Sequence, residues 1–276
     1  MVSQRFSGEG NRASDIHLTP RAAPTRDVEL ERAIAKDELT VLFQPQIEPI
    51  SGRVCAVEAL ARWTGERDTE ALFVRAQRHG LAERLSRVVQ RKALRIAGQW
   101  SGLLGQLRLS VNVIAADLMR DGYVDWLLEE LHEAGLSPHR LTVEITESSL
   151  IADQHLASVH LSTLRDAGIQ IAIDDFGTGY SNLAYLASLP LDSLKIDRAM
   201  IANLVGGSRD RIVVRAMIGL AHELSLKVIV EGVESTAQLG LVAGWGCDLY
   251  QGFLSAGALD EAELERFVAA TLAVAA

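Results

Sequence analysis

Eight short apolar segments of this sequence each carry a polar side chain near their C-terminal end. The segments are rich in Val, Ile and Leu, and their polar residues are Gln44, Glu58, Asn112, Glu144, the pair Asp174–Asp175, Lys195, Glu231 and Gln251. A buried strand needs no such residue for its own packing, because burying a polar group costs free energy unless it finds a partner. The series therefore predicts that several strand ends converge on one functional site.

The charge balance of this set indicates bound cations. Five carboxylates face the single lysine of the set, Lys195. Carboxylates held a few ångströms apart cannot all stay ionised alone, so either several are protonated or metal ions lie among them. Oxygen ligands from Asp, Glu, Asn and Gln favour Mg²⁺ or Mn²⁺. None of the seven histidines lies at a strand end, which disfavours Zn²⁺.

Two divalent ions in a carboxylate cup suit phosphodiester hydrolysis, because they clamp the phosphate, activate a water and stabilise the leaving oxygen. Lys195 would then neutralise or orient the nucleophile, and Glu231 would accept its proton. Neighbouring strand residues point to opposite faces, so Asp174 and Asp175 should both reach metal only at the very end of their strand, where Gly177 begins a turn. A barrel enzyme that uses one Mg²⁺ on sugar phosphates is the alternative at this point. Taken singly, each polar residue could instead cap a helix or satisfy a loop.

The elements that must position these residues are strands that alternate with helices. We expect strands at 41–47, 54–60, 107–113, 141–147, 169–175, 193–197, 227–233 and 248–254, and helices from about 27, 83, 153, 208, 235 and 260. The pattern predicts an α/β fold, a (β/α)₈ TIM-type barrel. Only residues 48–53 join the first two strands, too few for a parallel crossover, so the first strand should be antiparallel. In the helix from 208, one apolar face is expected from Ile212, Val213, Ala216, Met217, Leu220, Ala221 and Leu224.

Composition narrows the function classes. The chain carries 27 Lys and Arg against 36 Asp and Glu, a net charge of −9, which argues against a DNA or RNA polymer as partner. Two cysteines make no disulfide framework, and no apolar run resembles a signal peptide or a membrane span, so we expect a cytoplasmic protein with no membrane contact in this chain. Residues 1–26 are predicted to be a flexible tail or linker to a sensor domain, and residues 27–276 to be one barrel domain.

Motifs in order along the chain resemble those of the EAL domain family, the cyclic di-GMP phosphodiesterases. They are Glu58-Ala59-Leu60 with Arg62-Trp63, SVN at 110–112, VEITES from 143, DDFGTGYSNL from 174, LPLDSLKIDR from 189, VEGVES from 230 and GCDLYQGF from 246. The resemblance covers about residues 28–270. It implies the same barrel and a phosphoric diester hydrolase of bacterial second-messenger signalling. Such an enzyme uses Mg²⁺ or Mn²⁺, two ions, to convert cyclic di-GMP to linear 5′-pGpG.

The resemblance also implies roles for individual residues. The implied metal ligands are Glu58, Asn112, Glu144 and Asp174 for one ion and Asp174 and Asp175 for the other, and Glu231 is a further metal-site residue. Catalytic roles fall to Glu231 as general base, Lys195 and Glu58. Substrate contacts fall to Gln44, Leu60, Arg62 and Gln251. Coupling of metal binding to homodimer formation is implied for Glu147, Gly177, Thr178 and Gly179.

One departure from the family pattern keeps a second function open. The stretch between Trp63 and Leu81 is several residues shorter than is usual in the family. Since a fold does not guarantee an activity, the alternative is a catalytically weak or inactive EAL domain that acts as a cyclic di-GMP receptor or a protein-interaction module.

Overall fold

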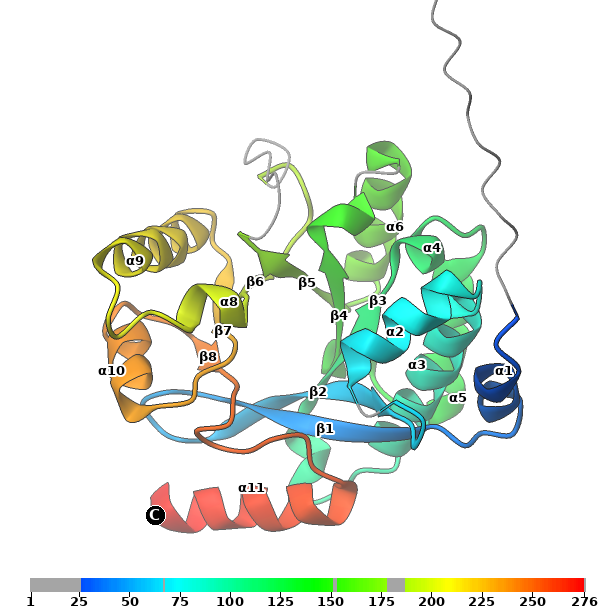
Figure 1. Ribbon diagram of the computed structural model, residues 1–276, viewed down its shortest axis with the longest axis horizontal. Helices are drawn as coiled ribbons and strands as arrows, with labels where there is room; N and C mark the ends of the chain where they lie inside the picture. The colour runs from blue at the N-terminus through cyan, green and yellow to red at the C-terminus, as the bar shows by residue number, and fades with distance from the viewer. Residues whose placement is uncertain (1–25, 67, 151–152, 178–186, 276) are drawn as a thin grey trace, which may run out of the picture.

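In the computed structural model, which describes residues 26–66, 68–150, 153–177 and 187–275, eight strands close into a barrel in chain order (Figure 1). The strands are β1 (Thr40–Ile47), β2 (Val54–Arg62), β3 (Arg108–Val113), β4 (Leu141–Thr146), β5 (Gln170–Phe176), β6 (Ser193–Ile196), β7 (Lys227–Val230) and β8 (Leu249–Tyr250). The (β/α)₈ architecture is thereby confirmed. Most of the predicted tail, residues 1–25, lies outside the described residues, as do Thr178 and Gly179.

Helices cover the outside of the barrel, and six of them begin where the sequence predicts. They are α1 (Val28–Ala35), α2 (Thr69–Arg78), α3 (Ala82–Gly98), α4 (Ala115–Leu118), α5 (Tyr123–Ala134), α6 (Gln154–Asp166), α8 (Arg198–Ile201), α9 (Ser208–Glu223), α10 (Thr236–Gly244) and α11 (Glu261–Ala275), with 3₁₀ helices at Leu104–Gln106, Pro138–Arg140 and Glu147–Leu150. Within the described ranges, no helix is both long enough and apolar enough to span a bilayer.

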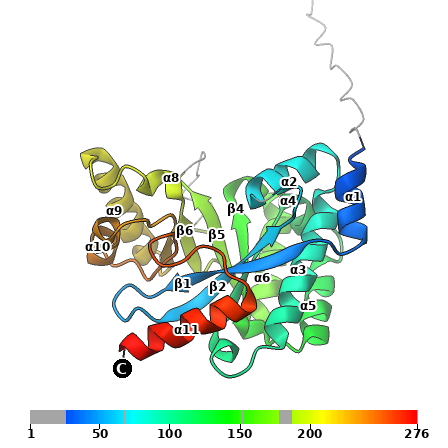
Figure 2. The same ribbon diagram turned by 60° about the horizontal axis from the view of Figure 1, so that its bottom comes forward.

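The first strand runs against all the others, as the short connection predicts. β1 pairs antiparallel with β2 from Thr40 opposite Arg62 to Ile47 opposite Val54. On its other edge β1 meets β8 at one residue pair, Ile47 and Tyr250. Backbone hydrogen bonds of 2.8 and 2.9 Å between Phe43 and Leu259 extend this seam. The last helix, α11, then packs along β1 (Figure 2).

The core between strands and helices is built from aliphatic side chains, as the scarcity of aromatic residues requires. Phe43 and Trp100 are an exception, with ring centroids 5.0 Å apart in an edge-on arrangement. The predicted face of α9 is wrong in part, because Ile212 and Val213 are exposed and the fully buried side chains include Val214 and Ile218. The apolar arc of this helix is wider than the face that the barrel covers, so periodicity alone selects the wrong edge.

An ion pair fastens α1 to α2. Asp27 caps α1 by accepting a hydrogen bond of 3.1 Å from the Leu30 backbone, and its carboxylate also accepts bonds of 2.6 and 3.0 Å from the Arg75 guanidinium of α2. The Asp27 side chain is only 8% exposed. The hydrogen bond from Arg75, more than any other contact, lowers the pKa of Asp27 to about 2.

Replacing Asp27 with Asn should lower the free energy of unfolding by about 1–2 kcal/mol at neutral pH, because the ion pair is lost. The folded-state pKa lies below the unfolded one, so this contribution is complete above about pH 5 and is lost as the pH falls from about 4 to 2. Urea denaturation at several pH values measures the difference from wild type. Glu129→Gln, which removes an exposed acid of α5, is the control. A difference that is equal at both ends of this pH range would contradict the assignment.

Candidate active site

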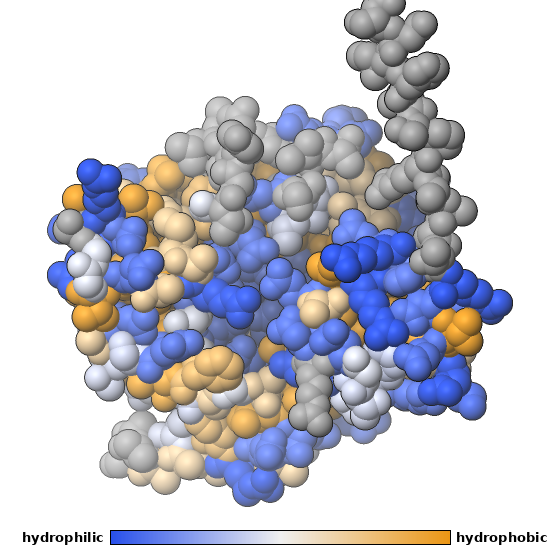
Figure 3. All heavy atoms as spheres, viewed as in Figure 1, coloured by the Kyte–Doolittle hydropathy of each residue, from blue (hydrophilic) through white to orange (hydrophobic). Residues whose placement is uncertain are grey.

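The predicted strand-end residues converge on one end of the barrel. Glu58 on β2 lies directly opposite Gln44 on β1, and Asn112 on β3 lies level with Glu144 on β4. Glu231 follows β7 and Gln251 follows β8, each at the first position beyond its strand. Hydrophilic residues gather in the hollow at the centre of this face (Figure 3). The C-terminal strand ends thus form a polar cup above an apolar barrel, the usual position of a site in this fold.

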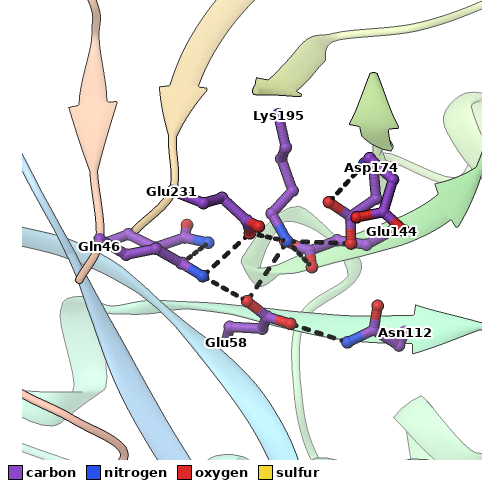
Figure 4. A network of polar contacts seen from close by, with 9 residues as sticks. Gln46, Glu58, Asn112, Glu144, Asp174, Lys195 and Glu231 are labelled. Atoms are coloured by element: carbon purple, nitrogen blue, oxygen red, sulfur yellow. Dashed lines mark hydrogen bonds and ion pairs between the residues drawn. The ribbon is translucent and has the colours of Figure 1, made fainter. Parts of the chain in front are cut away.

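Lys195 of β6 lies in the centre of the cup with a side chain that is 0% exposed (Figure 4). Its Nζ atom is 2.7 Å from Glu144 Oε2 and 2.7 Å from Glu231 Oε1. The same atom is 3.2 Å from Asp174 Oδ2 and 3.3 Å from Glu58 Oε2. One ammonium therefore joins carboxylates from four other strands or strand ends.

Amide side chains supply further donors to the cup. Asn112 Nδ2 donates to Glu58 Oε1 at 2.8 Å, and Gln251 Nε2 donates to Glu58 Oε2 at 2.7 Å and to Glu231 Oε1 at 3.0 Å. Gln251 is itself oriented by Gln46, whose Nε2 donates to Gln251 Oε1 at 3.0 Å. Sequence reasoning missed Gln46. The available signal was strand periodicity, because residues 44 and 46 share the inward face of β1.

A backbone irregularity brings Asp174 and Asp175 to the same site. Between Ile173 and Phe176 the pairing of β5 with β6 advances by three residues on β5 but by two on β6. This extra residue is a β-bulge, and Asp175 adopts a left-handed conformation there with φ of 56°. The sequence predicted that both acids reach the site only where the strand ends. The structure instead shows that β5 continues through Phe176 and that the bulge cancels the alternation of side chains.

The donor set fits divalent metal ions. Glu58, Glu144 and Asp174 bring one carboxylate oxygen each within 4.8 Å of one another, and so do Asp174, Asp175 and Glu231. In addition, Glu144 Oε1 is buried and has no hydrogen-bond partner among the described residues. An oxygen in this state needs a cation or a proton, because a buried acceptor without a partner costs about 1–3 kcal/mol. Two carboxylate triads that share Asp174 are thus able to hold metal.

Burial and mutual repulsion raise the pKa of most of these acids in the metal-free protein. Burial raises the pKa of Glu144 to about 8 and that of Asp175 to about 6, and it places the pKa of Glu231 well above its ordinary value. Burial also acts on Glu58, but the charge of Lys195 and the bonds from Gln251 and Asn112 outweigh it, so the pKa of Glu58 is lowered. The four acids around Lys195 overcome burial and raise its pKa. The cup therefore holds protons that a metal ion would displace.

The remaining predicted residues lie around the cup. Gln44 Nε2 donates to the backbone oxygen of Ala256 at 3.2 Å, and Leu60 is partly buried on β2. Arg62 is partly buried, donates to Ala61 O at 2.8 Å and hydrogen-bonds the Thr69 hydroxyl. Glu147 and Gly177 are two of the four residues predicted to couple metal binding to homodimer formation. The structure brings these two together, because the Gly177 N–H donates to Glu147 Oε1 at 3.5 Å.

Comparison with known proteins identifies the family. The sequence model of the EAL domain matches residues 27–258, and this chain belongs to that family. It is 37% identical over 252 residues to the cyclic di-GMP phosphodiesterase NbdA of Pseudomonas aeruginosa, covering 88% of this chain and 32% of that protein. It is 35% identical to the cyclic di-GMP phosphodiesterase PA2567 of the same organism, covering 86% of this chain and 41% of that protein. The chain therefore spans about a third to two fifths of these relatives.

Among solved structures, the chain is similar to the PaMucR phosphodiesterase in complex with c-di-GMP. The two superpose with a TM-score of 0.79 at 35% sequence identity, over 86% of this chain and 98% of that one. Because the match spans almost the whole of the other chain, the two chains share the same barrel fold.

The affinity of the metal-free protein for Mn²⁺ should rise with pH. Acids with a pKa of about 6 and about 8, Asp175 and Glu144, must lose protons to become ligands, so each displaced proton changes the dissociation constant by about tenfold per pH unit below that pKa. Calorimetric Mn²⁺ titrations between about pH 6 and 8.5, in two buffers of different ionisation enthalpy, measure affinity and proton release together. Asp175→Asn should remove the part of the dependence near pH 6. An affinity that does not vary with pH would contradict the assigned ligands.

Proposed function

We propose that this chain is a metal-dependent phosphodiesterase that hydrolyses cyclic di-GMP to linear 5′-pGpG. The observation that carries the proposal is the convergence of two carboxylate triads on a shared Asp174, in one buried cup at the strand ends. The names of the relatives and the ligand of the PaMucR structure support the choice of substrate. Metal ions bound to these triads would polarise the phosphate and make the attacking water more acidic.

Different residues of the chain would bind the metal ions, accept the proton and hold the carboxylates. Glu58, Asn112, Glu144 and Asp174 would hold one Mg²⁺ or Mn²⁺ ion, and Asp174, Asp175 and Glu231 the other. Glu231 would accept the proton of the attacking water, while Gln251, 3.0 Å from Glu231 Oε1, orients that carboxylate. Lys195 would keep four carboxylates in place through its ion pairs. No other cation among the described residues contacts these four groups. The oxygen of water bonds to phosphorus, the bond from phosphorus to the 3′ oxygen breaks, and that oxygen leaves with a proton.

Arg62 and Gln44 would bind the substrate outside the metals. Arg62 presents a partly buried cation at the end of β2, close enough to Glu58 for the charge of that acid to act on it, so it would meet a substrate phosphate beside the cup. Homodimer formation through Glu147 and Gly177, and a sensor domain linked through the N-terminal segment, remain predictions.

The direct test is to incubate the protein with cyclic di-GMP and a series of divalent metals and to separate the nucleotides. We expect pGpG with Mg²⁺ or Mn²⁺ and none with a chelator. A folded protein that binds cyclic di-GMP tightly but yields no pGpG with any divalent metal would reject the proposal in favour of the receptor function.

Glu58→Gln should reduce turnover more than about 100-fold, because it removes a metal ligand while preserving its shape, and even residues that only support ligands cost 10- to 100-fold. Circular dichroism should show an intact fold. The matched control is Glu48→Gln, at the opposite end of the β1–β2 hairpin, which should leave turnover unchanged. Comparable turnover in Glu58→Gln and wild type would refute the metal assignment.

Arg62→Ala should raise KM by about 10- to 100-fold and change kcat less, because a charge-assisted hydrogen bond to phosphate present before and during reaction is worth about 1.5–3 kcal/mol. Arg53→Ala, beyond the other end of β2, is the control for the loss of a charge. Steady-state kinetics with saturating metal give both constants. A fall in kcat at unchanged KM would show that Arg62 acts on the chemical step instead.

A further inference from the structure

A buried polar network lies behind β3, outside the cup. Its centre is Gln90 of α3, which is 1% exposed. Gln90 Nε2 lies within hydrogen-bond distance of three acceptors: Ser86 Oγ at 2.8 Å, the Asn112 backbone oxygen at 3.1 Å and Asp117 Oδ2 at 3.3 Å. Its Oε1 accepts a bond of 3.1 Å from the Tyr123 hydroxyl. A buried amide contributes to stability only when its polar atoms have partners, and both ends of the Gln90 amide have them.

The contact to Asn112 occurs where β3 no longer pairs with β2. Pairing between β2 and β3 ends at Glu58 opposite Ser110, two residues before Asn112, while pairing with β4 continues to Val113. The strands β2 and β3 separate there to open the cup. The Gln90 amide therefore reaches the backbone of Asn112 at the level where β2 no longer pairs with β3.

The surroundings allow Gln90 one orientation of its amide. The Asn112 carbonyl and the Asp117 carboxylate accept hydrogen bonds, so the amide nitrogen must face them, and the amide oxygen then accepts from the Tyr123 hydroxyl of α5. A rotation of the amide by half a turn would set its oxygen against two other acceptors, the Asn112 carbonyl and the Asp117 carboxylate. The donor to the Asn112 carbonyl is thus fixed by Asp117 of α4, with Tyr123 of α5 pairing the other end of the amide.

We propose that Gln90 is a positioning residue that fixes the backbone of Asn112 and thereby aims the Asn112 side chain at the metal site. The inference rests on the proposed function, because it assigns Asn112 as a ligand. Asn112 holds Glu58 through its Nδ2 atom, so a displaced Asn112 backbone would disturb two ligands of the same triad.

Mn²⁺ binding to the metal-free protein, measured by calorimetry without nucleotide, tests this proposal. Gln90→Leu, which keeps the volume but has no donor, should weaken Mn²⁺ binding by about 10- to 100-fold, the range found when supports of metal ligands are removed. The matched control is Glu130→Leu. Glu130 is also buried between α3 and α5, where Arg91 Nε donates to it at 2.6 Å, but among the described residues it forms no hydrogen bond or ion pair with β3. Glu130→Leu should lose stability in urea and keep wild-type Mn²⁺ affinity.

A second variant, Tyr123→Phe, covers a failure of Gln90→Leu to fold. It removes the hydroxyl that orients the amide and should weaken Mn²⁺ binding by about three- to tenfold, with binding restored at high metal concentration. Wild-type Mn²⁺ affinity in either folded variant would overturn the proposal. A wild type that binds Mn²⁺ without producing pGpG would refute the proposed function alone, and a wild type that binds no Mn²⁺ would overturn both.

Discussion

Four carboxyl groups around one buried ammonium, with a fifth at Asp175 beside them, are the constraint on which this structure depends. In a medium of low polarity, such a concentration of negative charge is stable only with protons, cations or donors placed at each oxygen. Lys195 provides one charge at the centre, and the amides of Asn112 and Gln251 provide directed hydrogen bonds. These groups come from different strands, so the closed barrel is what holds them at fixed separations. The apolar core packs the strands that carry these groups and so limits their movement.

Two departures from regular strand geometry adapt the barrel to this purpose. The bulge in β5 turns two consecutive acids toward one site, at the cost of a left-handed conformation at Asp175. The early end of the β2–β3 ladder widens the cup, and the backbone of Asn112 takes a side-chain donor from α3. In both places the regular hydrogen-bond pattern is given up where ligands need room or direction.

The strands and the strand-end polar residues were predictable, since burial makes a strand apolar and any exception, such as Glu144 or Lys195, is conspicuous. The bulge was not, because the residues of β5 carry no mark of the extra position and only its pairing with β6 reveals it. Gln90 could have been noticed as a polar residue four positions after Ser86 on the apolar face of α3. Its partner, however, is a backbone oxygen of another element, which no pattern within one helix encodes.

The reversed direction of β1 decides from which side the rest of a longer protein could reach the site. Since Thr40 at the start of β1 lies opposite Arg62 at the end of β2, the chain upstream of β1 enters at the open end of the cup. There α1 holds α2 through Asp27 and Arg75, and the first residue of α2, Thr69, hydrogen-bonds Arg62. The amino end of the described residues is thus connected to Arg62 through only two helices, on the side where the cup opens.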